Sequence, residues 1–168
     1  APLSASSIVR MKQYWEEDYN AWRRQPLESD YLYLWIDGIY PKAGAVDEPL
    51  CVLVAMGVNA QGEKKILALE SGYRESYEAW KELFGQLKKR GVKWIGLVIS
   101  DGIQSLHKAL HEVFPRTLKQ RCWVHKMRNI LDKVPPKIHD QIQEELRGIY
   151  NATSLSEAKQ LIALFTNR

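Results

Sequence analysis

Residues 31–38 read Tyr-Leu-Tyr-Leu-Trp-Ile-Asp-Gly, and residues 93–102 read Lys-Trp-Ile-Gly-Leu-Val-Ile-Ser-Asp-Gly. Each is a short apolar run closed by an Asp-Gly pair, which is typical of a buried strand that ends at a turn. The two runs therefore predict two core strands and place Asp37 and Asp101 where those strands end.

The segments around these runs predict the other elements, from strand-like apolar runs and from apolar residues at helical spacing. Strands are expected at 31–36, 50–58, 65–69, 93–100 and 117–122, and helices at 4–24, 76–90, 103–113, 124–134, 137–150 and 154–165. The short connections between the first three strands indicate an antiparallel meander. The chain is thus expected to be α/β, with a helix, then β-β-β-α-β-α-β-α, then extra helices.

The composition excludes several classes of protein. The chain has 168 residues, of which 45% are hydrophobic and 26% charged, so it is neither disordered nor fibrous. No apolar run approaches the ~20 residues that span a bilayer. Its two cysteines, Cys51 and Cys122, are too few for a disulfide scaffold and fit a reducing cytoplasm. The chain starts Ala-Pro-Leu-Ser without Met, which suggests a piece of a longer protein.

The positive charge is concentrated in one stretch. The net charge is +4, but seven Lys and Arg residues and a single acid lie between Arg116 and His139. This imbalance is the electrostatic pattern of a surface that binds a phosphate backbone, and a solvated helix face is the alternative. The expected phosphate contacts are Arg121, Lys126 and Arg128.

The two strand-end aspartates suggest a metal site. Carboxylates on adjacent strands can converge, and two like charges are tolerated there beside a cation. Carboxylate oxygens suit Mg²⁺ or Mn²⁺, and two such ions ~3.5–4 Å apart promote phosphodiester chemistry. Either aspartate alone is better explained as a cap of the next element. Together, Asp37 and Asp101 favour the metal interpretation.

Aspartates on the first and fourth strands of this element order form the pattern of the ribonuclease H-like fold. Three motifs, Tyr33–Gly38, Val98–Gly102 and Gln120-Arg-Cys-Trp-Val-His-Lys-Met-Arg-Asn129, resemble the core of mutator-type bacterial insertion-sequence transposases. The resemblance extends over essentially the whole chain. It implies a DDE enzyme, in which two Asp and one Glu bind divalent metal. Water and then the freed 3′ hydroxyl would attack DNA phosphodiesters at the element ends and in the target.

The same resemblance implies the partners and the domains. The partners would be DNA, as terminal inverted repeats and target, and a second subunit of the full-length protein, in the bacterial cytoplasm at the nucleoid. Residues 1–28 would be an N-terminal helix and linker, residues 29–134 the ribonuclease H-like core, and residues 135–168 the truncated start of a helical insertion.

The third carboxylate is expected to lie beyond Arg168. A compact spacing of ~35 residues after Asp101, as in related transposases, reaches Pro135-Pro136, where no acid is found. The later acids Glu144, Glu145 and Glu157 are expected to be salt-bridged surface residues. The 168-residue chain alone is therefore expected not to cut or join DNA.

The block Cys122-Trp-Val-His125 has the spacing of metal ligands, but zinc needs four ligands and no second pair follows. The resemblance places Cys122, Trp123 and His125 near the active site, in a structural or DNA-handling role rather than in catalysis. Trp123 would either stack on a base or pack in the core.

Two other functions remain open. One is a ribonuclease H-like nuclease or resolvase, against which the Cys-Trp-x-His block and the lack of a nearby third and fourth carboxylate argue. The other is a domesticated DNA-binding protein that keeps the fold without catalysis.

Overall fold

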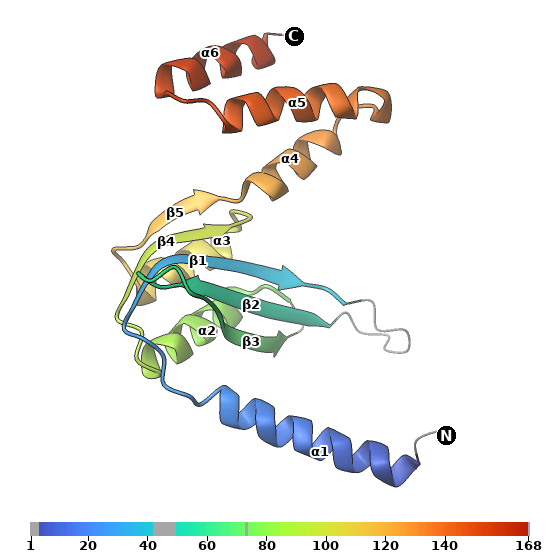
Figure 1. Ribbon diagram of the computed structural model, residues 1–168, viewed down its shortest axis with the longest axis vertical. Coiled ribbons are helices and arrows are strands. Elements are labelled where there is room, and N and C mark those ends of the chain that lie inside the picture. Colours follow the sequence, from blue (N-terminus) through green and yellow to red (C-terminus); the bar gives the residue numbers. More distant parts are fainter. Residues whose placement is uncertain (1–3, 42–49, 73, 168) are drawn as a thin grey trace. The chain divides into compact units, whose positions relative to one another are not determined.

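The computed structural model describes residues 4–41, 50–72 and 74–167 (Figure 1). The chain forms two compact units, residues 1–120 and 121–168. The predicted order of elements is confirmed. Their bounds are α1 Ala5–Trp22, β1 Asp30–Ile39, β2 Cys51–Val58, β3 Lys64–Gly72, α2 Tyr77–Lys89, β4 Trp94–Ser100, α3 Gln104–Val113, β5 Leu118–Arg121, α4 Trp123–Leu131, a 3₁₀ turn η1 Pro136–Ile138, α5 His139–Tyr150 and α6 Leu155–Thr166.

The five strands form one mixed sheet in the order β3-β2-β1-β4-β5. Strand β2 is antiparallel to both β1 and β3, which confirms the predicted meander, whereas β4 is parallel to β1. A parallel neighbour requires a crossover connection, and α2 lies in that connection.

The turn expected at Asp37-Gly38 is absent. Strand β1 continues to Ile39, because its antiparallel ladder with β2 goes on through Asp37 opposite Val54 and Ile39 opposite Val52. The parallel ladder with β4 ends earlier, at Trp35 opposite Ile99. Asp37 therefore lies inside β1 but beyond the end of the parallel pairing.

One face of the sheet is covered by α2 and α3, which lie behind it in Figure 1. Leu34 and Ile36 of β1 point into this core. The fully buried Trp80 and Phe84 of α2 and Leu110 of α3 belong to the same cluster. We call this side the covered face.

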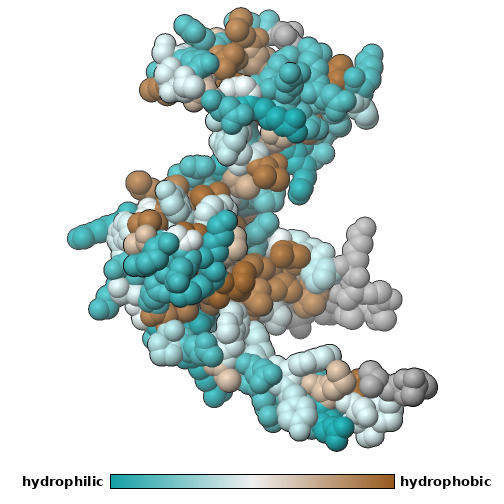
Figure 2. All heavy atoms as spheres, in the orientation of Figure 1, coloured by the Kyte–Doolittle hydropathy of each residue, from teal (hydrophilic) through white to brown (hydrophobic). Residues whose placement is uncertain are grey.

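The other side, which we call the open face, is also apolar. Ile66, Met56, Trp35 and Ile99 are direct partners across β3, β2, β1 and β4, so their side chains form one row. The rings of Tyr33 and Trp35 lie 5.9 Å apart, as expected for neighbours on one face. Apolar surface is visible over β1 and β2 in Figure 2. Within the described part of the first unit, none of these four side chains is fully buried.

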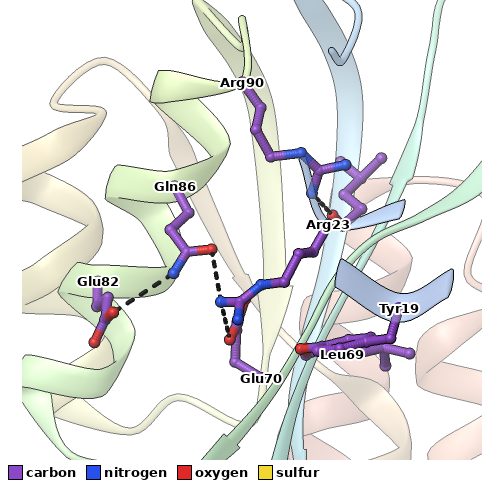
Figure 3. Close-up of polar contacts among 8 residues, drawn as sticks. Tyr19, Arg23, Leu69, Glu70, Glu82, Gln86 and Arg90 are labelled. Atoms are coloured by element: carbon purple, nitrogen blue, oxygen red, sulfur yellow. Dashed lines mark hydrogen bonds and ion pairs between the residues drawn. The ribbon is translucent and has the colours of Figure 1, made fainter. Parts of the chain in front are cut away.

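The C-terminal end of α1 contacts the rest of the first unit (Figure 3). The Tyr19 hydroxyl donates to the Leu69 carbonyl at 2.5 Å, and Arg23 forms an ion pair with Glu70 at 2.8 Å. The guanidinium of Arg90 lies 5.7 Å from the centre of the Trp22 ring. The helix starts at the predicted cap, where Ser4 Oγ accepts from the Ser7 N–H, but α1 contains no buried residue.

The second unit is helical. Helix α5 packs on α4 and on α6, and it buries Leu146 and Ile149. The turn before α5 is fixed by a 3.0 Å hydrogen bond between the His139 ring and the Val134 carbonyl. Among the described residues of the whole chain, no helix combines the length and apolar character needed to cross a membrane.

Candidate active site at the ends of β1 and β4

The register of the parallel strands brings the two predicted aspartates together. Trp35 and Ile99 are opposite each other, Asp37 follows two residues after the first, and Asp101 follows two residues after the second. Each aspartate therefore lies two residues beyond the last pair of the parallel ladder, at the same end of the sheet. Because strand side chains alternate, Asp37 belongs to the open face, next to the apolar row, whereas Asp101 follows the last residue of β4.

Backbone groups orient both carboxylates. Asp37 Oδ1 accepts from the Gly38 N–H at 3.0 Å, and Asp101 Oδ1 accepts from the Ile103 N–H at 3.0 Å. The second bond spans a turn whose middle residue, Gly102, has φ +95°, in the region that favours glycine. This turn leads directly into α3, so Asp101 is fixed between a core strand and a core helix.

A third carboxylate, Glu75, lies against the residue that follows Asp37, and no sequence motif indicated it. The Glu75 carboxyl group packs against Gly38, where an added Cβ would lie 2.4 Å from Glu75 Cδ. The Tyr40 hydroxyl donates to Glu75 Oε1 at 3.3 Å. Glu75 precedes α2 and belongs to no motif, so the only signal was the glycine that leaves room for it.

The charges at this sheet edge affect a buried thiol. Burial raises the pKa of Cys51, and the negative charges of Glu75 and Asp37 add to that effect, against a hydrogen bond from Tyr40. Burial, with contributions from Cys51 and Glu75, raises the pKa of Tyr40 to about 12. The edge therefore combines several acidic groups with little local positive charge on β1 and β2.

Helix α3 contributes a histidine. His107 Nε2 lies 3.4 Å from Ser100 Oγ, at the end of β4. Burial lowers the pKa of His107, Lys119 lowers it further, and Asp101 opposes the shift. The imidazole is therefore neutral at pH 7 and adds no positive charge beside Asp101.

The donors fit a hard divalent cation. Mg²⁺ prefers carboxylate oxygens and often uses only one or two of them, with water completing its shell. Asp37 and Asp101 supply this donor type. Within residues 4–41, 50–72 and 74–167, no group of three or more His, Cys, Asp or Glu side chains is placed to hold a metal ion.

The Cys-Trp-x-His block lies in the second unit, at the start of α4. Cys122 precedes the helix as its N-cap residue, and Trp123 and His125 lie in its first turn, all three half-buried. Trp123 does not pack in a core of buried residues. Instead its ring meets that of Tyr150 on α5, with centroids 5.6 Å apart and planes at 66°.

The predicted phosphate contacts Arg121, Lys126 and Arg128 are all exposed. Arg121 ends β5, whereas Lys126 and Arg128 are two residues apart on α4. Residues at that spacing lie on different sides of a helix. The structure therefore does not gather the three cations on a single face of α4.

Glu144 and Glu157 are exposed, as expected, and Glu145 is half-buried, but among the described residues the expected ion pair is wrong for Glu157. Its carboxylate accepts from the Thr153 N–H and hydroxyl, each at 2.8 Å, while Ser154 caps the Glu157 N–H. These bonds lower the pKa of Glu157. The residue thus closes the start of α6, in the manner of a capping box.

Known proteins resemble this chain over its whole length. A family model described as Transposase, Mutator family, matches residues 1–168. The transposase for insertion sequence element IS6120 of Mycolicibacterium smegmatis is 41% identical over 166 residues, which are 98% of this chain and 51% of that protein. The transposase for insertion sequence element ISRM5 of Rhizobium meliloti (strain 1021) is 39% identical over 169 residues, covering 99% and 42%. The chain therefore spans about half the length of these relatives.

Among solved structures, the HTLV-2 integrase catalytic core domain in complex with magnesium is similar with a TM-score of 0.41 and 11% identity, over 78% of this chain and 91% of that one. The sheet order and the positions of α2 and α3 agree with the ribonuclease H-like class predicted from the sequence. Since the family model covers every residue, the chain belongs to the Mutator family of transposases.

Proposed function

We propose that this chain is the larger part of the catalytic core of a DNA transposase, with Asp37 and Asp101 as two of its metal-binding carboxylates. One observation carries the proposal. In a chain of this family, β1 and β4 pair in parallel up to Trp35 opposite Ile99, two residues before each aspartate, which supports a shared site. Their backbone hydrogen bonds hold the carboxylates before any ligand binds.

In the proposed site, the protein side chains bind the metal ions and the DNA and orient them. Asp37 and Asp101 would hold Mg²⁺ or Mn²⁺ in a two-metal site, and water or DNA phosphate would complete the ligand shell. When bound, such ions activate the attacking oxygen and stabilise the leaving oxygen of a phosphodiester. His107 is neutral at pH 7 and would therefore add no positive charge of its own beside Asp101. Arg121, Lys126 and Arg128 would bind DNA phosphates at the terminal repeats or the target.

Residues 1–28 would form a helix and linker, 29–134 the catalytic core, and 135–168 the start of a helical insertion. The third carboxylate would lie beyond Arg168, the full-length protein would act as a homodimer, and it would reside at the nucleoid. With Mg²⁺ and element-end DNA, the 168-residue chain should give no cleavage, and efficient cleavage would contradict this proposal.

Metal binding can be tested with Mn²⁺ alone, by calorimetry or by the spin resonance of the free ion. Asp37→Asn and Asp101→Asn should each weaken binding more than about 10-fold. Asp30→Asn is the matched control, because Asp30 lies at the opposite end of β1 and accepts from Ser29. Equal affinity in all four proteins would refute the metal role.

A nuclease of the ribonuclease H type is the second candidate, and Glu75 favours it. Such a nuclease would need a further carboxylate close to the two aspartates, and Glu75 packs against Gly38, the residue after Asp37. Cleavage of an RNA/DNA hybrid with Mg²⁺, lost in Glu75→Gln, would support the nuclease. If the RNA/DNA hybrid stays uncleaved, the nuclease is ruled out and the transposase proposal stands.

A further inference from the structure

Helices α4 and α5 of the second unit enclose a groove of about 450 Å³. Its apolar wall includes Trp123, Met127, Leu131 and Tyr150, and Arg128 and Arg147 also line it. This size lies within the range of small-molecule sites. The groove is formed by the second unit alone.

The aromatic wall is preorganised. Trp123 and Tyr150 meet edge to face at 5.6 Å, an arrangement that aromatic pairs prefer. Tyr150 is 59% exposed, and Trp123 is only half-buried. The pair therefore offers ordered ring surface to a ligand at the protein surface.

The charge of the groove is positive. Arg147 donates to the neutral Gln143 amide at 3.4 Å. Among the residues that the structure describes, no carboxylate forms an ion pair with Arg128 or Arg147, and no acid lines the groove. The site thus combines flat apolar surface with two cations, which complements a ligand that carries both a ring and an anion.

We infer that this groove binds one nucleotide of a DNA strand, with its base against Trp123 and Tyr150 and its phosphate beside Arg128 and Arg147. The inference rests on the proposed function, which supplies DNA as the ligand. Aromatic rings stack on any base, and arginine forms bidentate bonds with phosphate. An apolar peptide would satisfy the rings but leave both arginines without an anion.

The bound base must be unpaired. A base inside a duplex is stacked on both sides, and removing it costs a few kcal/mol. The groove should therefore favour DNA with an unpaired 3′ extension over the same duplex with blunt ends. Phosphate contacts elsewhere on the protein should not distinguish the two.

The test measures fluorescence anisotropy of the two labelled duplexes with the 168-residue chain. Trp123→Ala should weaken binding of the extended duplex about 5- to 100-fold and leave the blunt duplex nearly unchanged. Trp123→Phe should restore most of the loss, which separates stacking from misfolding. Arg147→Gln should also weaken the extended duplex more than the blunt one.

Matched controls are Trp15→Ala, a 65% exposed tryptophan of α1, and Lys159→Gln, an exposed cation of α6. The same loss in a control would overturn the inference, as would equal loss on both DNAs without rescue by Trp123→Phe. A change in self-association with unchanged DNA binding would assign the groove to a second copy instead. If the unmodified chain binds neither DNA, the proposed function is refuted as well. If it binds both DNAs and Trp123→Ala changes neither affinity, only the inference about the groove is refuted.

Discussion

The two faces of the sheet are both apolar, but helices pack on only one of them. On β1, Leu34 and Ile36 are 0% and 3% exposed on the covered face, whereas Tyr33, of the open face, is 43% exposed. Both faces of β1 carry apolar residues, so the difference in exposure comes from the packing of α2 and α3 on one face. Residues of the covered face should therefore determine the stability of the protein. Residues of the open face should determine which ligands this surface contacts.

The strongest test compares two tryptophans on opposite sides of the sheet. Trp80→Ala should lower the free energy of unfolding by about 3–5 kcal/mol, because Trp80 is fully buried beneath the covered face. Trp35→Ala should cost far less, since Trp35 lies on the open face. Urea unfolding followed by circular dichroism measures both, and equal losses would show that the open face is packed.

Thiol labelling provides the second test. Cys51 is buried with a raised pKa, whereas Cys122 is half-buried outside the sheet. Cys51 should react with a disulfide reagent about 100-fold more slowly than Cys122, because it must wait for the core to open. Cys51→Ser and Cys122→Ser assign the two phases, and similar rates would contradict a closed covered face.

A third test concerns the turn between Asp101, which follows β4, and α3, which packs on the covered face. Gly102→Ala should destabilise the protein by about 1–3 kcal/mol, because φ +95° strains an L residue. Gly148→Ala is the control, in a helix where an added Cβ meets no atom within 4 Å. Thermal unfolding of both variants suffices, and a neutral Gly102→Ala would disprove the strained turn.

The smallest effect is a pH dependence from α3. The pKa of His107 is lowered below 6.5 in the folded protein, so the unfolded chain takes up the proton first as the pH falls. The stabilising contribution of neutral His107 is full above pH 6.5 and is lost below it. Between pH 7.5 and 5.5, Tm should fall about 2 °C more in the unmodified protein than in His107→Gln. An equal fall in both would show an unshifted histidine.

Much of this fold could be predicted from the sequence, because most strands and helices show a characteristic spacing of apolar residues and end at turn-forming residues. The positions of the two aspartates after apolar runs could be recognised, and the structure shows that the strands that carry those runs, β1 and β4, are neighbours. The length of β1 could not be predicted, because Asp-Gly is a local turn signal and the pairing of β1 with β2 overrides it. Glu75 and the groove partner Tyr150 lie far from any motif, and only tertiary packing brings them to Gly38 and Trp123.

The attachment of α1 at one end has a dynamic consequence. Its last turn is held by Tyr19 and Arg23, but its first turns depend on the Ser4 cap and on helix propensity. The part of α1 before Tyr19, residues 5–18, has about the length at which isolated helices are marginal in water, so opening should begin at the N-terminal end. Amide hydrogen exchange should accordingly slow steadily from residue 8 to residue 22, which would identify α1 as a segment that unwinds from one end while the sheet remains intact.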